Sequence, residues 1–289
     1  MKSGIILIDK EIGITSSKAI LKLKRKLKLN KIGHTGTLDP FATGLLICPV
    51  NSATRLSDYA LNADKTYSGI IKFGISTDTH DLEGKIVSES DNYPSLEEVK
   101  LEIKNFLGEI SQIPPMASAI KVNGIPAYKK FRKGEEVILE PRKVRINKFE
   151  VQQLSANEFK FLIDVSKGTY IRSIARDLGK ILDCGAILTE LRRESSYPFN
   201  VKDAKKIDDL TEEDILTWTD LFPNIKTEFF DDEKVKKLQN GNQEFLENLS
   251  LDEGSERIVY SSIKSNNPLG LLIKKDDKWT IGFNLSAGV

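Results

Sequence analysis

The sequence has few of the side chains from which metal sites and disulfides are built. Its 289 residues include only two histidines, His34 and His80, and two cysteines, Cys48 and Cys184. These residues show neither the CxxC nor the HxxxH spacing that brings metal ligands together, so we expect no metal site. The two cysteines lie far apart in apolar or small-residue surroundings, which indicates reduced thiols and a cytoplasmic location.

Long apolar runs and the common nucleotide and hydrolase motifs are also missing. No stretch approaches the ~20 apolar residues of a membrane span, so we expect no membrane association. The run Ile5–Ile8 is too short for the core of a secretion signal and predicts a buried strand instead. Neither GxxxxGK[ST] nor GxSxG occurs, which disfavours a phosphate-cradling loop and a serine hydrolase.

What is present predicts a globular chain with unevenly distributed charge. With 289 residues, 39% of them hydrophobic, the chain can form one large domain or a large and a small one. The net charge is +1, but residues 1–206 hold 34 basic and 25 acidic groups, whereas residues 207–256 hold 4 basic and 15 acidic groups. A basic body beside an acidic connector favours an anionic partner, although charge balance for solubility explains the same composition.

Alternating and helically spaced apolar residues predict the main elements. The predicted strands are Ile5–Ile8, Lys65–Phe73 and Phe159–Val165. The predicted helices begin after a cap at Thr15 or Ser16, at Ser95, and at Ile171, and the last of them points Ile171, Ile174, Leu178 and Ile181 inward. After Pro223, one short helix and three short strands, Arg257–Tyr260, Gly270–Lys274 and Trp279–Phe283, predict a small β-rich C-terminal domain.

Two segments have the composition of nucleic-acid contacts. Lys18–Lys31 contains seven basic residues and no acid, which is typical either of a solvated helix face or of a helix that faces phosphates. Residues 114–148 mix Lys and Arg with the aromatic residues Tyr128 and Phe131, a combination that suits RNA phosphates and unstacked bases. An exposed hairpin explains the second segment equally well.

One carboxylate stands alone in the stretch GHTGTLDPFATGLL, which covers residues 33–46. Asp39 lies in a predicted tight loop between small polar residues and an apolar run, and an Asp-Pro pair is most often a turn device. Arg172 lies in the first turn of a predicted helix, where the helix dipole disfavours a cation. Arg172 is therefore expected to have an anionic partner elsewhere in the fold.

Five phrases in order resemble the TruB family, the bacterial tRNA pseudouridine-55 synthases. GHTGTLDPFATGLL is similar to the catalytic loop of that family, and DKEIGITS near the N-terminus resembles its DKPxGxTS. The other three phrases are KTYSGIIKFGISTDTHDLEG, PPMASAIKVNG and SKGTYIRSIARDLGKILDCGAILTELRR. Together they cover about residues 4 to 193, and their joint occurrence by chance is negligible.

The resemblance implies a set of catalytic and substrate-binding residues. Asp39 would be the nucleophile, Arg172 would pair with it, and Tyr67 would lie against the target uracil and act as a base. The pocket for a flipped-out nucleotide would be lined by His34, Tyr67, Tyr170 and Leu191. Flipping is required because a stacked base cannot leave C1′, turn over and rejoin through C5. A guanidinium beside the carboxylate would oppose the effect of burial and keep it ionised.

The resemblance also implies the fold, the domains and the partner. We expect an α+β fold with a mixed, largely antiparallel central sheet flanked by helices. The catalytic domain would cover residues 1–225, with an RNA-binding insertion at about 114–148, and residues 226–289 would form a small PUA-like RNA-binding domain. Phosphate contacts are expected from Lys22, Lys24, Arg25, Lys129, Lys130 and Arg132. The protein would act in the cytoplasm as a monomer on the T arm of tRNA, at uridine 55, without a metal or cofactor.

Three residues depart from the family phrases, and two other functions stay open. Glu11 replaces a Pro, Ala117 replaces a Tyr or Phe, and Glu194 stands where a Thr is usual. A non-catalytic RNA-binding or tRNA-folding protein would need only the two basic segments. A hydrolase that uses Asp39 with His34 is a third alternative.

Overall fold

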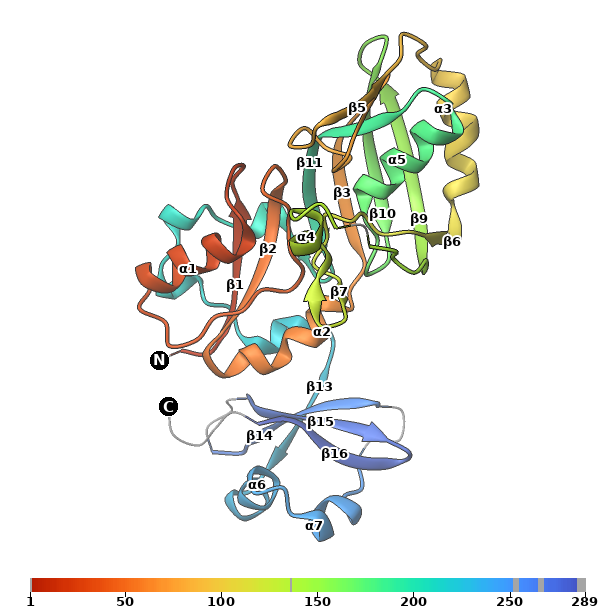
Figure 1. Ribbon diagram of the computed structural model, residues 1–289. Coiled ribbons are helices and arrows are strands. Elements are labelled where there is room, and N and C mark those ends of the chain that lie inside the picture. Colours follow the sequence, from red (N-terminus) through yellow and green to blue (C-terminus); the bar gives the residue numbers. More distant parts are fainter. Residues whose placement is uncertain (1, 136, 252–254, 265–267, 285–289) are drawn as a thin grey trace.

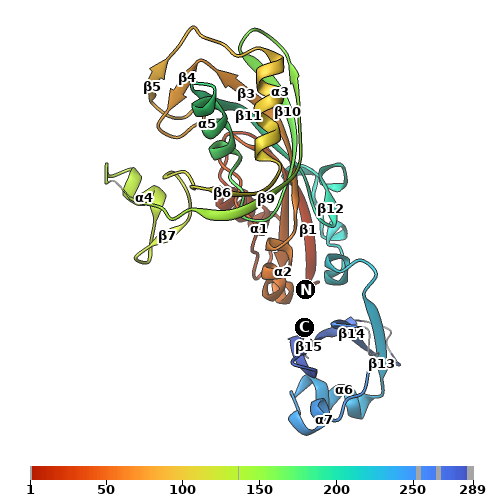
Figure 2. The same ribbon diagram turned by 90° about the vertical axis from the view of Figure 1, so that its right-hand side faces the viewer.

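The computed structural model describes residues 2–135, 137–251, 255–264 and 268–284, and these residues form two main sheets (Figures 1 and 2). The larger sheet has eight strands, in the spatial order β1 (Gly4–Lys10), β2 (Thr43–Val50), β11 (Ala186–Ser196), β3 (Lys65–Phe73), β10 (Glu158–Val165), β9 (Arg142–Gln153) and β6 (Gly108–Gln112), with β12 (Phe199–Asn200) paired to β11. Neighbouring strands are antiparallel except β2 and β11, which are parallel and pair only at Thr43–Arg192 and Gly44–Arg193. The predicted mixed, largely antiparallel sheet is confirmed.

One side of strand β3 is buried in the apolar core of the large sheet. Its bounds, Lys65–Phe73, are those predicted, and every second residue from Lys65 to Phe73 is buried. Tyr67 and Ile71 on this buried side pack with Phe159 and Phe161 of β10 and with apolar residues of the helices. The alternation therefore reflects one face turned to a helix-covered core and one face that is partly open to solvent.

Three helices cover the sheet, and their start signals were readable in the sequence. They are α1 (Ser16–Lys26), α3 (Leu96–Ile103), which continues as η2 (Lys104–Phe106), and α5 (Ile171–Ile181). The Thr15 hydroxyl caps α1 by accepting from the backbone N–H of Lys18, and Ser95 forms a capping box with Glu98 at the start of α3. Helix α1 covers β1 and β2, whereas α3 and α5 lie together over β3, β10 and β9 (Figure 1).

The predicted inward position of Ile181 in α5 is wrong. Ile171, Ile174 and Leu178 are buried, but Ile181 is 53% exposed. Three turns of 3.6 residues counted from Ile171 arrive nearer to position 182 than to 181. Leu182 accordingly packs against the core instead.

The segment between β6 and β9 projects away from the sheet (Figure 2). It contains a small hairpin, β7 (Lys121–Val122) and β8 (Ile125–Pro126), and the short helix α4 (Ala127–Phe131). The predicted insertion limit of 148 is wrong, because residues 142–148 belong to β9 and pair with β6 and β10 in the central sheet. The projecting insertion, here residues 113–141, is therefore shorter than predicted. A second hairpin, β4 (Ile75–Thr77) with β5 (Ile86–Glu89), follows β3.

The last part of the described chain forms a four-stranded sheet with two helices. Its elements are β13 (Lys226–Phe230), α6 (Asp232–Gln239), α7 (Gln243–Glu247), β14 (Arg257–Ser262), β15 (Pro268–Lys275) and β16 (Lys278–Asn284). The three short strands predicted from the sequence are present as β14, β15 and β16, whereas β13 was not predicted. One face of this sheet packs on α6 and α7.

The two sheets are joined by a shared apolar cluster rather than by a bare linker. Val259 and Phe283 of the small sheet pack with Trp218 and with Ile5 and Leu7 of β1. The chain passes between the sheets through the short helix η3 (Val201–Asp203) and then through the first part of the acidic connector, with η4 (Ile207–Asp209), η5 (Glu212–Asp214) and η6 (Trp218–Leu221). The remaining short helices, η1 (Asn51–Leu56) and α2 (Ser57–Leu61), follow β2. Among the described residues, no helix has the length and apolar character needed to cross a membrane.

Candidate active site

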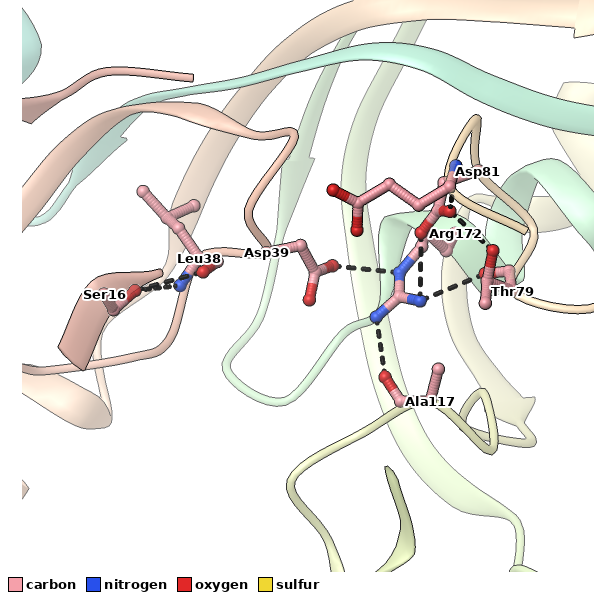
Figure 3. Close-up of polar contacts among 8 residues, drawn as sticks. Ser16, Leu38, Asp39, Thr79, Asp81, Ala117 and Arg172 are labelled. Carbon is pink, nitrogen blue, oxygen red and sulfur yellow. Dashed lines mark hydrogen bonds and ion pairs between the residues drawn. The ribbon is translucent and has the colours of Figure 1, made fainter. Parts of the chain in front are cut away.

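The carboxylate of Asp39 and the guanidinium of Arg172 meet at the centre of the large sheet (Figure 3). Asp39 lies in the loop that precedes β2, and Arg172 lies in the first turn of α5. The Nε of Arg172 is 2.9 Å from Oδ2 of Asp39. The Arg172 side chain is only 5% exposed, whereas that of Asp39 is 32% exposed and so stays reachable from one side. The anionic partner predicted for Arg172 is therefore present.

Arg172 also connects two other segments to Asp39. Its Nη1 donates to the carboxylate of Asp81 at 3.2 Å and to the carbonyl of Thr79 at 3.0 Å, both in the turn after β4. Its Nη2 donates to the carbonyl of Ala117 at 2.9 Å, at the base of the projecting insertion (Figure 3). Because this last contact uses the backbone, an Ala at position 117 leaves it intact. The guanidinium thus holds the Asp39 loop, the 79–81 turn and the insertion together.

Asp81 is a site residue that the sequence reasoning missed. It is 2% exposed, and its Oδ1 also accepts from the Thr79 hydroxyl at 2.5 Å and from the backbone N–H of Glu83 at 3.0 Å. A buried carboxylate held by a cation and two further donors fixes the guanidinium in one orientation. The only signal in the sequence was the density of turn-forming polar residues in TDTHDLEG.

The environment of Asp39 acts on its pKa in two directions. Burial raises the pKa of Asp39 above its ordinary value, and the negative charge of Asp81 raises it further. The Arg172 guanidinium and, to a smaller degree, the Lys10 ammonium lower the pKa of Asp39. The net shift is upward, so the carboxylate is less stabilised as an anion than an exposed aspartate would be, which makes it a stronger base and nucleophile once ionised.

The phrase DKEIGITS holds the backbone on both sides of Asp39. The Ser16 hydroxyl accepts from the N–H of Leu38 at 2.8 Å and donates to the carbonyl of Leu38 at 3.0 Å. The backbone N–H of Gly13 donates to the carbonyl of Pro40 at 2.8 Å, and Nζ of Lys10 reaches the same carbonyl at 3.4 Å. These contacts hold the residues before and after Asp39, so the segment DKEIGITS fixes the backbone of the Asp39 loop.

Apolar side chains form the wall beside the ion pair. Tyr67 of β3 and Leu191 of β11 are each 8% exposed and pack in one cluster with Leu38 and Phe41 of the Asp39 loop. Tyr67 and Leu191 therefore belong to the same buried cluster as Leu38, the residue before Asp39. A wall of this kind excludes water from one side of the carboxylate.

Tyr170 is held at the start of α5 by a residue that the sequence analysis did not single out. The side-chain amide of Gln112 accepts from the backbone N–H of Tyr170 at 2.8 Å and donates to its carbonyl at 3.1 Å. Burial raises the pKa of Tyr170, and the charges of Asp39 and Arg172 both act on the phenol. Tyr170 directly precedes α5, whose first turn holds Arg172.

His34 lies along β2, and no hydrogen bond in the described part of the chain joins it to Asp39 or Arg172. The residues on either side of it donate to β2, Gly33 to Pro49 and Thr35 to Ile47. Burial and the nearby Arg193 lower the pKa of His34, and its Nδ1 is buried without a hydrogen-bond partner. His34 is therefore a neutral, flat side chain with one free polar atom, and nothing couples it to Asp39 in the way a hydrolase would require.

The predicted phosphate-binding residues fall on two surfaces. Lys22 of α1 forms an ion pair with Asp208 of the acidic connector at 2.7 Å, so the connector already occupies this predicted contact. Arg25 on the same helix and Lys129 and Arg132 on the insertion are exposed, whereas Lys24 and Lys130 are half-buried. The basic face of α1 is thus partly neutralised within the molecule. Among the described residues, no group of histidine, cysteine or carboxylate side chains is arranged to hold a metal ion.

Comparisons with known proteins match this chain over both halves of the large sheet. The model of the TruB family pseudouridylate synthase N-terminal domain matches residues 24–171, and that of the tRNA pseudouridylate synthase B C-terminal domain matches residues 172–220. The chain belongs to the TruB family. The boundary between the two matched TruB models falls at the first turn of α5, so the model that matches residues 24–171 contains Asp39 and the one that matches residues 172–220 contains Arg172.

Curated TruB relatives align with this chain over most of their own length. The tRNA pseudouridine synthase B of Opitutus terrae is 44% identical over 206 residues, which are 71% of this chain and 86% of the relative. That of Bordetella avium is 44% identical over 210 residues, 72% of this chain and 86% of the relative. That of Endomicrobium trichonymphae is 45% identical over 207 residues, 71% and 90%.

Solved structures support the TruB-type fold. A chain of a Cbf5-Nop10-Gar1 complex superposes with a TM-score of 0.69 at 24% identity, covering 93% of this chain and 78% of that one. A chain of an H/ACA RNP bound to a substrate RNA containing 2′-deoxyuridine gives a TM-score of 0.67 at 21% identity, covering 98% and 83%. At these identities the similarity concerns the fold alone.

Proposed function

We propose that this TruB family chain converts the T-loop uridine at position 55 of tRNA to pseudouridine, with Asp39 as the nucleophile. In this isomerisation the C1′–N1 bond breaks, the uracil turns over and a C1′–C5 bond forms. The proton at C5 is lost to water and N1 gains one, so no redox partner or co-substrate is consumed. Membership in the TruB family supports the reaction class, and the Asp39–Arg172 pair is the observation that supports the assignment of the nucleophile.

Asp39 has the properties that the chemistry requires. A carboxylate that attacks carbon must be ionised, fixed in place and shielded from water that would intercept the sugar. Arg172 stabilises the ionised form, the contacts of Leu38 and Pro40 fix the backbone, and the apolar wall limits water. Attack at C1′, addition to C6 and removal of the C2′ proton all begin from this same ionised carboxylate.

The remaining predicted site residues suit a flipped-out nucleotide. Extruding a base costs a few kcal/mol, which the enzyme offsets by holding the base and filling the gap in the RNA. We assign the apolar side of the pocket to Tyr67 and Leu191, which share an apolar cluster with Leu38, and the role of the base to Tyr67. We assign Tyr170, which directly precedes α5 and Arg172, to the same pocket. Neutral His34, with its free Nδ1, is suited to the space that the uridine leaves.

The RNA is expected to bind across the insertion and α1. The exposed basic residues Arg25, Lys129 and Arg132 supply phosphate contacts, and Tyr128, with the Arg132 guanidinium 5.7 Å from its ring centroid, supplies a stacking face. We infer that the T arm of tRNA is the substrate, that the four-stranded sheet of residues 226–284 is a PUA-like RNA-binding domain, and that the enzyme acts as a monomer in the cytoplasm.

The test is a tritium-release assay on a T-arm RNA labelled at C5 of the target uridine. The expected result is release of label to water by the wild-type protein, and none from an RNA that carries the label only in uridines other than the target. The Asp39→Asn protein should bind the RNA with unchanged affinity and release no label. Turnover by Asp39→Asn near the wild-type rate would contradict a nucleophilic role. RNA binding without release by the wild-type protein would identify a non-catalytic RNA-binding protein instead.

A further inference from the structure

Arg193 is a buried cation in the middle of the large sheet. It lies on β11 and is 1% exposed. Its Nε donates to the carbonyl of Leu45 at 2.6 Å, and its Nη2 donates to the carbonyl of Gly36 at 3.1 Å. None of the carboxylates in the described part of the chain forms an ion pair with it. Its partners are therefore backbone dipoles rather than a counter-charge.

A buried guanidinium without a counter-charge lowers the stability of the folded state. Moving a charged group out of water costs several kcal/mol even after the surrounding structure relaxes, and two carbonyl acceptors offset only part of this cost. A methionine or leucine would fill the same volume without the penalty. The position of Arg193 therefore calls for an explanation other than core packing.

The two carbonyls that Arg193 binds are the two ends of the Asp39 loop. Gly36 precedes residues 37–44, which comprise the loop and the first two residues of β2 and are called loop 37–44 below, and Leu45 follows them, so one side chain spans this segment. The main chain of Arg193 contributes as well, because it pairs with Gly44 in the short parallel ladder between β2 and β11. Gly44 has φ +100°, and a Cβ there would lie 2.4 Å from the carbonyl oxygen of Arg193. The end of the loop is thus pressed against β11.

We propose that Arg193 is a positioning residue for pseudouridine formation, whose guanidinium ties both ends of loop 37–44 and so fixes the Asp39 carboxylate against Arg172 and toward the flipped nucleotide. This inference rests on the proposed function. Arg193 acts on Asp39 through the backbone and does not touch the substrate. A shift of about 1 Å in a reacting group lowers turnover by about 100-fold while leaving binding nearly unchanged.

The charge of Arg193 provides a signature that packing alone would not give. After burial, Arg193 is the group that lowers the pKa of His34. The chain has only two histidines, so the NMR titration of His34 can be assigned by comparison with a His80→Gln protein. Removing the charge at position 193 should raise the pKa of His34, whereas Arg193→Lys should leave it nearly unchanged.

The experiment compares Arg193→Lys and Arg193→Met with the wild type in the tritium-release assay and in RNA binding. Lysine keeps the charge, but its donors all lie on one nitrogen, so we expect it not to reproduce the separate Nε and Nη2 contacts of the planar guanidinium. We expect kcat to fall about 10-fold or more in Arg193→Lys and about 100-fold in Arg193→Met, with the Kd for RNA within about 3-fold of the wild type. Arg192→Lys is the matched control, since Arg192 is the neighbouring residue and its guanidinium binds Asp9 and the Thr43 hydroxyl but neither the Gly36 nor the Leu45 carbonyl.

Three outcomes separate the inference from the proposed function. Wild-type kcat in a folded Arg193→Lys protein would overturn the positioning role, because charge without the double tie would then suffice. Equal loss of kcat in Arg192→Lys would overturn it as well. If Arg193→Met does not fold, the Arg193→Lys comparison still decides. An inactive wild type that binds the RNA would instead refute the proposed function.

Discussion

Replacing Arg172 by Met should damage both the fold and the chemistry. Arg172 is 4% exposed and its guanidinium contacts Asp39, Asp81 and two backbone carbonyls. Met has a similar length but no charge, so the substitution removes all of these contacts with little change in packing. Asp81, which is 2% exposed, would then be a buried carboxylate without its cation.

The expected loss follows from these contacts. Removing one partner of a buried ion pair costs about 3–5 kcal/mol, because the other charge stays buried and unpaired. The Asp39 side chain is one-third exposed, so its share is smaller, on the order of 1 kcal/mol or less. We expect the free energy of unfolding to fall by about 3–5 kcal/mol, chiefly through Asp81. Turnover should fall by about 100-fold to 1,000-fold, the usual loss when a preorganised electrostatic group is removed.

The assay is urea unfolding together with tritium release, for the wild type, Asp39→Asn, Arg172→Met and the double variant. Arg176→Met is the control, because Arg176 lies one turn further along α5, is 25% exposed at its side chain, and binds Asp177 and the Ile113 carbonyl but neither Asp39 nor Asp81. It should change the free energy of unfolding by no more than about 1 kcal/mol. Strict additivity of Asp39→Asn and Arg172→Met in the free energy of unfolding would refute an energetic coupling between the two groups.

Three further predictions concern the surroundings of the ion pair. Asp81→Asn should move the acidic limb of the kcat/KM profile to lower pH, because the charge of Asp81 raises the pKa of Asp39; an unmoved limb would contradict this. Gly44→Ala should lower the free energy of unfolding in urea by at least about 2 kcal/mol, because φ is +100° and the added Cβ would lie 2.4 Å from the carbonyl oxygen of Arg193. Gly134→Ala is the control, since Gly134 has φ +74° but open space around the added Cβ, and it should lower that free energy by about 1 kcal/mol. Burial lowers the pKa of Lys10 from 10.5 to about 8, so between these pH values the unfolded chain keeps a proton that the folded chain has lost. Stability should therefore rise with pH across that window, and by less in Lys10→Met, as measured by urea unfolding at both ends.

The sequence was most informative where short-range rules apply. The strand Lys65–Phe73 follows from simple alternation, and the caps at Thr15 and Ser95 follow from the residues that accept hydrogen bonds at helix starts. The dipole argument on Arg172 predicted a distant anion, and the ordered family phrases identified Asp39 as that anion. These inferences depend on neighbours within one element or on phrases of known order.

What the sequence did not reveal depends on contacts between distant segments. Asp81 and Gln112 become site residues only because the fold carries them to Arg172 and Tyr170. In the sequence, Arg193 does not differ from the other basic residues. Its contact with the Gly36 carbonyl arises because β2 and β11 pair in parallel. The basic composition of residues 142–148 also concealed a central strand, because alternate polar residues of β9 point to solvent while Val144 and Ile146 are buried. Composition could not separate a sheet strand from an RNA-binding loop.

The cluster that joins the two sheets has a consequence for synthesis on the ribosome. Ile5 and Leu7 emerge among the first residues, yet their partners Trp218 and Phe283 follow more than 200 residues later. At ordinary rates of translation this delay is on the order of tens of seconds. During that time the cluster on this side of β1 holds only its earlier members, which are Leu45, Ile47, Ala53 and Leu56. We expect this side of β1 to be fully covered only after Trp218 and the strands of the small sheet have been synthesised.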